Sequence, residues 1–222
     1  MFSVAWRAGL LGSTFGFGLF LSIDNDVTLR PFGIYMCILS FFHWSEYFVT
    51  AISSSDTLSL DSFLLNHSIE YWAAASLSWL EFWLEYYFCP SLKLLSFVTL
   101  LGIILCFVGE GFRKAAMLTA GRNFTHLIQY QKRIHHQLVT HGVYSLFRHP
   151  SYVGWFWWSI GTQVTLCNPI CTLIYAYVSW RFFNDRIYHE EITLINFFGE
   201  EYVEYQKRVP TGLPGIPGYQ PL

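Results

Sequence analysis

The chain has 222 residues, of which 53% are hydrophobic, 20% aromatic and only 13% charged. A soluble domain usually carries about 25% charged residues, so this composition indicates an integral membrane protein. The formal net charge of −2 gives no indication of a nucleic-acid partner. The five cysteines form no CxxC pair and the eight histidines follow no metal-ligand spacing, so we expect free thiols in helix packing and no metal site.

Four apolar segments come first along the chain: Gly9–Ile23, Phe32–Ile52, Ser68–Phe88 and Leu92–Gly111. A hydrocarbon core of about 30 Å needs about 20 helical residues. The first segment is the shortest, and we interpret it as a retained membrane span because no clear signal-peptide cleavage site follows it. It contains Gly12 and Gly16 in a GxxxG arrangement, which predicts the close approach of a neighbouring helix.

A polar interval, residues 112–150, separates these segments from two shorter apolar pieces, Tyr152–Thr165 and Ile170–Phe183. Each piece has fourteen residues, and because such a helix rises only about 21 Å, neither comfortably spans a bilayer alone. An Asn-Pro turn signal stands between them. We therefore predict a helical hairpin over residues 152–186 that enters and returns to one membrane face.

The basic residues indicate the orientation of the spans. If residues 112–150 face the cytosol, eleven of the thirteen Lys and Arg lie on that side, and only Arg30 and Lys93 lie opposite. This distribution agrees with the positive-inside rule. No repeat or linker divides the chain. The predicted fold class is thus an all-α integral membrane protein, a multi-span helical bundle with about four spans plus a C-terminal helical hairpin.

Charged residues gather at both ends of the predicted hairpin. Because proline suits the first turn of a helix, Pro150 is expected to open the hairpin, with Arg148 and His149 just outside it. A helix start attracts anions, although a basic anchor for lipid headgroups fits this pattern as well. At the other end, Arg186 and Glu190 are four residues apart and share a helix face. Either ion pairing on a solvated helix end or a functional site is consistent with that pair.

The remaining polar signals are weaker. The run HQLVTHGVY within the polar interval indicates extended backbone and a turn, whose free groups could hydrogen-bond a flat heterocycle. No P-loop, GxGxxG, GxSxG or HExxH motif occurs. Acidic residues inside the apolar segments indicate hydrogen bonding between helices or interfacial placement, with an ion pathway as the alternative. These residues are Glu46, Glu70, Glu81, Glu85 and Glu110.

Two long stretches resemble the isoprenylcysteine carboxyl methyltransferase family: LVTHGVYSLFRHPSYVGWFWWSIGTQ and RFFNDRIYHEEITLINFFGEEYVEYQKRVPTGLP. The upstream SLSLDSFLLNHSIEYWAAASLSWLEFW and EGFRKAAMLTAGRNFTH resemble its animal members, so the similarity covers nearly the whole chain. Animal members often carry further N-terminal membrane helices, and we expect this chain to start after them. The RHPSYVG and EEYxxY pieces are shared more loosely with sterol reductases and phospholipid methyltransferases, which stay as alternatives, as does a non-enzymatic channel or scaffold.

The resemblance implies a reaction and a location. A methyl group passes from S-adenosylmethionine to the C-terminal α-carboxylate of a prenylated cysteine, which leaves S-adenosylhomocysteine and a methyl ester. The implied partners are processed CaaX proteins such as small GTPases, together with membrane lipid, and no metal is implied. The implied location is the endoplasmic reticulum membrane, with a cytosolic cofactor-binding cap and no Rossmann sheet. Within a single domain of residues 1–222, residues 1–111 supply spans and residues 112–222 the cofactor-binding and catalytic region.

The resemblance also assigns residues by matching position. The implied cofactor contacts are Gln129, His136, Gln137, Leu138, Val139, Tyr144, His149 and Glu190. Arg186 is implied to bind the substrate, and Arg186 and Glu190 form the expected catalytic pair. An α-carboxyl group has a pKa of about 3.5 and is already an anion at neutral pH, so its attack on a methyl group needs no general base. A planar Arg fork suits such a carboxylate.

Overall fold

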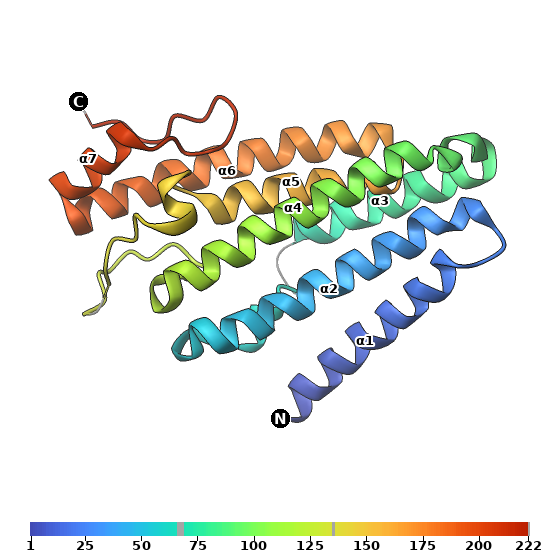
Figure 1. The fold of residues 1–222 in the computed structure, drawn as a ribbon, viewed down its shortest axis with the longest axis horizontal. Helices are drawn as coiled ribbons and strands as arrows, with labels where there is room; N and C mark the ends of the chain where they lie inside the picture. The colour runs from blue at the N-terminus through green and yellow to red at the C-terminus, as the bar shows by residue number, and fades with distance from the viewer. Residues whose placement is uncertain (66–68, 135, 222) are drawn as a thin grey trace.

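The computed structural model describes residues 1–65, 69–134 and 136–221. Within these residues the chain forms helices joined by turns, and no strand occurs there. The α-helices are α1 (Phe2–Ser22), α2 (Arg30–Ser53), α3 (Ile69–Phe88), α4 (Ser96–Ala120), α5 (Pro150–Thr165), α6 (Pro169–Phe198) and α7 (Glu200–Arg208). The long helices lie side by side in an elongated bundle, and α7, the C-terminal tail and the segment between α4 and α5 gather at one end (Figure 1). The predicted all-α fold is confirmed.

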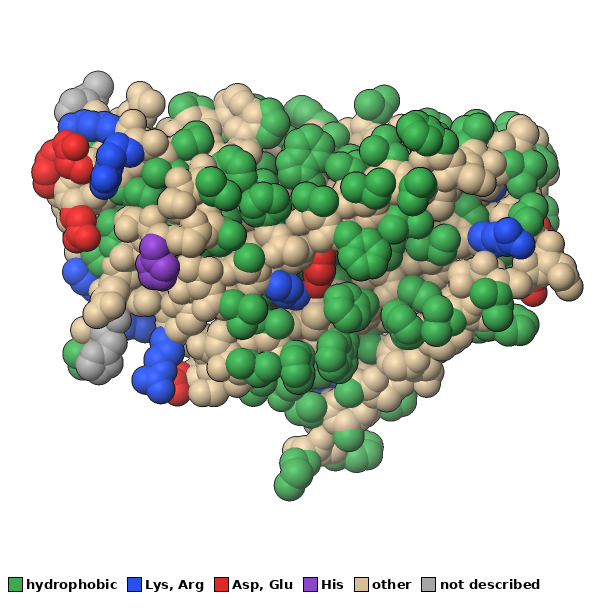
Figure 2. Space-filling view, in the orientation of Figure 1, with side chains coloured by type: hydrophobic (Ala, Val, Ile, Leu, Met, Phe, Trp, Pro, Cys, Tyr) green, Lys and Arg blue, Asp and Glu red, His purple; other side chains and the backbone are tan. Residues whose placement is uncertain are grey.

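The flank of the bundle is strongly apolar. Figure 2 shows hydrophobic side chains spread along it, while charged side chains cluster at the end that carries α7. Large side chains such as Phe97, Phe107 and Leu173 are 79%, 70% and 73% exposed. By length and composition, two of the described helices could cross a membrane: α1, and α4 together with the turn that extends it to Asn123. An apolar surface of this extent suits contact with lipid.

Several predicted helix boundaries are wrong. Helix α1 begins at Phe2 rather than Gly9, and α4 continues to Ala120, so residues 112–120 of the expected polar interval are helical. The charged side chains of this part of α4 pair with partners on α2. This pairing offsets the free-energy cost of placing charges in an apolar helix. Helix α6 has 30 residues instead of fourteen and is about 45 Å long, enough to span. The predicted start of the third span at Ser68 lies outside the described residues.

The helical hairpin itself is confirmed, and side chains of α3 and of the 3-10 turn Pro90–Leu94 complete its turn. Helices α5 and α6 are joined by Leu166–Asn168. The buried Lys93 ammonium donates to the carbonyl oxygens of Leu166 (2.9 Å) and Cys167 (3.1 Å). Glu81 on α3 accepts from the first backbone N–H groups of α6, at Ile170 and Cys171, both at 2.7 Å. These bonds satisfy backbone groups that have no water partner at membrane depth.

The intramembrane glutamates bond mainly to other elements, as expected. Besides Glu81, Glu85 accepts from Lys93 at 2.6 Å, and Glu110 on α4 accepts from the Ser45 hydroxyl on α2 at 2.6 Å. Glu46 on α2 binds cations of α4. The Glu70 side chain lies outside the described residues.

Close helix contacts occur at other glycines than predicted. No neighbouring atom lies within 4 Å of the place where a Cβ of Gly12 or Gly16 would stand, so the GxxxG prediction for α1 is wrong. One such contact, which we call the glycine seam, joins α4 to α5 at Gly109 and Gly154. A Cβ on Gly109 would stand 2.5 Å from the carbonyl oxygen of Gly154, and the reverse distance is also 2.5 Å. Since no side chain fits there, these glycines let the two backbones touch.

Candidate active site

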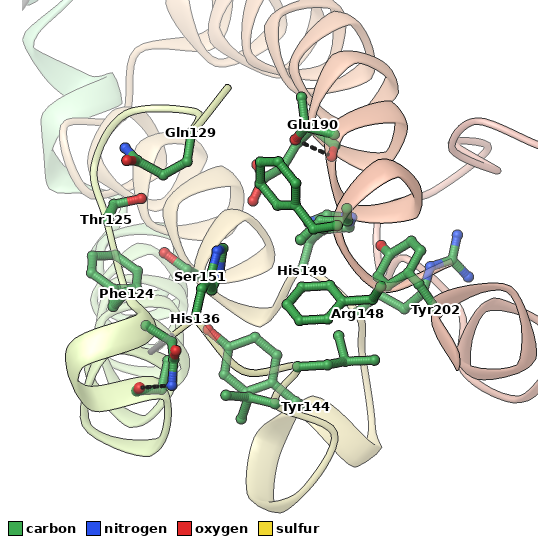
Figure 3. A pocket seen from close by; sticks show the side chains of 18 of the residues that line it. Phe124, Thr125, Gln129, His136, Tyr144, Arg148, His149, Ser151, Glu190 and Tyr202 are labelled. Carbon is green, nitrogen blue, oxygen red and sulfur yellow. Dashed lines mark hydrogen bonds between the residues drawn. The ribbon is translucent and has the colours of Figure 1, made fainter. Parts of the chain in front are cut away.

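A cavity opens where the segment between α4 and α5 meets the start of α5 and the end of α6. It encloses about 840 Å³ of space, including its open mouth. In Figure 3, Gln129 and Thr125 lie on one side of the hollow, and Glu190 and His149 lie on the other. The eight residues implied as cofactor contacts all line it: Gln129, His136, Gln137, Leu138, Val139, Tyr144, His149 and Glu190.

Local sequence explains how this wall is shaped. Pro150 stands at the first position of α5, with His149 as its N-cap, as predicted. Between α4 and α5 the described residues include two short 3-10 helices, Gly121–Asn123 and Gly142–Ser145. Gly142 has a φ of +59°, a conformation that favours glycine. The Asn123 side chain accepts from the backbone N–H of Gln137 at 2.9 Å, which ties the start of this segment to its middle.

A tyrosine joins the two residues of the expected catalytic pair. The Tyr152 hydroxyl donates to Glu190 and accepts from Arg186 Nε at 2.8 Å. Arg186 Nη2 donates to the main-chain carbonyl of His126 at 2.6 Å. Glu190 lines the cavity, whereas Arg186 is absent from its lining and lies over the rings of Tyr152 and Phe182, at 5.4 and 5.9 Å. Sequence reasoning did not single out Tyr152, because it stands at the start of an apolar run.

Two cavity residues present polar atoms of defined protonation. Burial, followed by the charges of Arg133 and Lys132, lowers the pKa of His136, so its imidazole is neutral at neutral pH. Its Nδ1 is buried and has no hydrogen-bond partner among the described residues. Burial also raises the pKa of Tyr144, which keeps the phenol protonated. A buried polar atom without a partner is costly, so this nitrogen fits a site that a polar ligand completes.

Arg148 has a structural place that corrects the headgroup-anchor interpretation. It is only 7% exposed, and its Nε donates to Glu191 at 2.8 Å. His149 Nε2 lies 3.1 Å from the same carboxylate oxygen, and the backbone N–H of Tyr219 donates to the other oxygen at 2.8 Å. Tyr202 also bonds to Glu191. We call these contacts the Glu191 hub. They attach the C-terminal tail and the cavity wall at His149 to α6.

A second buried carboxylate, Glu46 on α2, lies behind the cavity. Arg113 of α4 binds it with two bonds, from Nε at 2.6 Å and from Nη2 at 2.7 Å. Lys114 forms a further ion pair with it, and His126 Nε2 lies 3.0 Å from its Oε2. Arg113 Nη1 also donates to Ser151, which lines the cavity, at 2.8 Å. We call this set the Glu46 cluster. Sequence reasoning did not identify its pairing.

No group of three or more His, Cys, Asp or Glu side chains that could hold a metal ion occurs among the described residues. The polar atoms of the cavity are instead nitrogen and oxygen donors and acceptors suited to an organic ligand.

Comparisons with known proteins point to one family. The profile of the isoprenylcysteine carboxyl methyltransferase (ICMT) family matches residues 101–196. The chain is 59% identical over 217 residues to the protein-S-isoprenylcysteine O-methyltransferase of Homo sapiens, covering 98% of this chain and 76% of that protein. The Xenopus laevis protein of the same name is 58% identical over 218 residues, which are 98% of this chain and 75% of the frog protein.

A solved structure agrees with these relatives. It is described as the eukaryotic intramembrane Ras methyltransferase ICMT, and it superposes with a TM-score of 0.97 at 49% sequence identity. The superposition covers 99% of this chain and 78% of that one.

Proposed function

This chain belongs to the isoprenylcysteine carboxyl methyltransferase family, and we propose how its cavity and the residues behind it divide the work. It is a membrane-embedded enzyme that methylates the C-terminal carboxylate of a prenylated cysteine. The family assignment replaces the reductase, phospholipid methyltransferase and channel alternatives.

The cavity is the proposed site of S-adenosylmethionine. The observation that carries this proposal is that all eight implied contact residues line one hollow. S-adenosylmethionine supplies an electrophilic methyl group on a sulfonium. Glu190 accepts hydrogen bonds from the cationic or hydroxyl groups of this cofactor, and His136 supplies the unpartnered Nδ1. Its neutral imidazole avoids repelling a positively charged ligand.

Arg186 is the proposed residue for the substrate carboxylate. Its guanidinium is held from one side by Tyr152 and from the other by the His126 carbonyl, so its plane is fixed before substrate arrives. A carboxylate sheds water reluctantly, and an oriented two-donor fork replaces part of that hydration. No base has to remove a proton, so the protein contributes orientation, charge and exclusion of water. The prenyl chain lies on the lipid side of α6, where Phe182 is 43% exposed.

The biological setting is part of the proposal. The distribution of basic residues supports a cytosolic mouth for the cavity. The membrane is that of the endoplasmic reticulum, and the substrates are processed CaaX proteins such as small GTPases. Residues 1–111 supply the membrane scaffold and residues 112–222 the binding and catalytic parts, with α4 continuous across that boundary.

The decisive experiment follows labelled methyl from S-adenosylmethionine to N-acetyl-farnesylcysteine in detergent or lipid. We expect transfer by the unaltered chain, and loss of transfer with retained S-adenosylhomocysteine binding for Arg186→Ala. S-adenosylhomocysteine, and not NADPH, should raise the melting temperature. Near-normal transfer by Arg186→Ala, or loss of activity only through weaker cofactor binding, would falsify the substrate role.

A further inference from the structure

One residue connects the Glu46 cluster to the proposed substrate residue. The ring of His126 lies on Glu46, with Nε2 3.0 Å from Oε2. The main-chain carbonyl of the same residue accepts from Arg186 Nη2 at 2.6 Å. The side chain of His126 therefore bonds to the buried cluster, while its main-chain carbonyl bonds to Arg186.

The cluster is a firm support for that ring. Glu46 is 0% exposed and Arg113 is 2% exposed. Two Arg113 nitrogens bind the two carboxylate oxygens, a geometry that fixes orientation as well as distance. The Arg113 guanidinium also lies 4.6 Å from the centre of the Trp155 ring. Because α2, α4 and α5 all take part, the position of Glu46 is determined by the packed helices rather than by the looped segment.

We propose that His126 is a positioning residue for methyl transfer. Glu46 holds its imidazole, and this bond places the His126 carbonyl where it orients the Arg186 fork towards the substrate carboxylate. The inference rests on the proposed function of Arg186. His126 acts only through Arg186.

The same carboxylate also supports the cofactor cavity through a separate contact. Arg113 Nη1 donates to Ser151 at 2.8 Å, and Ser151 lines the cavity. Glu46 thus has one connection towards the substrate, through His126, and another towards the cofactor, through Arg113. A change at His126 removes the first connection and leaves the second in place, which separates the two effects in an experiment.

The test compares three variants of histidines in the segment between α4 and α5. His126→Phe keeps a flat ring but removes the donor to Glu46. His126→Gln keeps an amide N–H that can reach the carboxylate. His141→Phe alters an exposed histidine of the same segment and serves as the control. The measurements are kcat and KM for N-acetyl-farnesylcysteine, and the Kd of S-adenosylhomocysteine.

We expect His126→Phe to lower kcat/KM for the prenylcysteine by roughly ten- to a hundredfold, because small displacements of a positioning group carry large rate costs. The Kd of S-adenosylhomocysteine should stay unchanged, His126→Gln should recover much of the loss, and the control should show none. If His126→Phe does not fold, His126→Asn, which is polar but shorter, replaces it.

A double variant distinguishes this inference from the proposal on which it rests. In an Arg186→Ala background, His126→Phe should cause no further loss, since His126 acts only by placing the carbonyl that orients Arg186. Independent, multiplicative losses, an equal weakening of cofactor binding, or unaltered kcat/KM in His126→Phe each overturn the positioning role. If Arg186→Ala itself keeps normal kcat/KM, the proposed substrate residue is wrong, whatever His126→Phe does.

Discussion

Glu46 and Glu191 are two fully buried carboxylates with similar partners and different tasks. Both side chains are 0% exposed, and each binds one arginine and one histidine. The Glu46 cluster joins α2, α4 and α5 and leads, through His126, to the proposed substrate residue Arg186. The Glu191 hub joins α6 to the C-terminal tail and to the His149 wall of the cavity.

The difference lies in what each arginine has besides its carboxylate. Arg148 also donates to the main-chain carbonyls of Gln206, Val209 and Pro217, so part of its charge is satisfied without Glu191. Among the described residues, Arg113 has Ser151 as its one further hydrogen-bond partner, and Lys114 adds a second cation to Glu46. Removing Glu46 should therefore affect the whole bundle, whereas removing Glu191 should loosen one end of it.

The greatest loss is expected for Glu46→Leu. It leaves the buried Arg113 and the partly buried Lys114 without their main counter-charge, which costs about 3–5 kcal/mol when one partner of a buried pair is removed. We expect a large drop in melting temperature in detergent and poor recovery of folded protein. A Glu46→Leu variant that melts like the unaltered chain would show that the cluster is not a support for the bundle.

Glu191→Gln should cause a smaller and more local loss. The amide keeps the shape but turns N–H groups towards donors such as Tyr219 N–H, at a cost of about 1.5–3 kcal/mol. Limited proteolysis should then cut first within residues 209–221 while the helices stay intact. Glu204→Gln, on an exposed ion pair, is the matched control and should change nothing measurable. Simultaneous loss of helices and tail would contradict the local role.

Arg186→Lys tests the substrate side by geometry instead of charge. Lysine keeps the positive charge but loses the planar fork, so we expect roughly a ten- to hundredfold lower kcat/KM for the prenylcysteine. S-adenosylhomocysteine binding, measured by calorimetry, should hardly change. Equal activity in the lysine variant would mean that charge alone serves the carboxylate.

Glu190→Ala tests the cofactor side in the same way. The substitution removes an acceptor that lines the cavity and leaves the Tyr152 hydroxyl without it. We expect S-adenosylhomocysteine to bind roughly two- to tenfold more weakly, with the fold intact. An unchanged Kd would show that Glu190 bonds to Tyr152 but does not contribute to cofactor affinity.

The smallest effect is a pH dependence through His136. Its pKa is lowered in the folded chain, so between that value and the usual 6.5 the unfolded chain binds more protons. Stability contributed by the neutral imidazole is thus present above about pH 6.5 and is lost as the pH falls. Protonation also places a positive charge beside a cationic cofactor. Cofactor affinity should fall on acidification, and His136→Asn should flatten that profile; an unchanged profile excludes His136 as its source.

Sequence patterns predicted the hairpin because proline at a helix start and Asn-Pro at a turn are local signals. The cavity residues were predicted by resemblance, since no spacing rule shows that Gln129 and Glu190 line one hollow. The Glu46 cluster could not be predicted, because Glu46 and Arg113 are 67 positions apart and either charge could have faced water. The same pairing explains why α4 continues past residue 112, where the sequence pattern placed the start of a polar interval.

The glycine seam between α4 and α5 has a consequence for the exchange of spent cofactor. At Gly109 and Gly154 backbone lies against backbone, with no side chain that could rotate aside. This close contact favours a fixed arrangement of α4 and α5 beside the cavity. If the cavity holds the cofactor as proposed, we expect S-adenosylhomocysteine to leave past the described residues of the segment between α4 and α5, where bonds such as Gln137 N–H to Asn123 can open. Where product release limits turnover, kcat follows the rate at which this segment opens rather than the rate of methyl transfer.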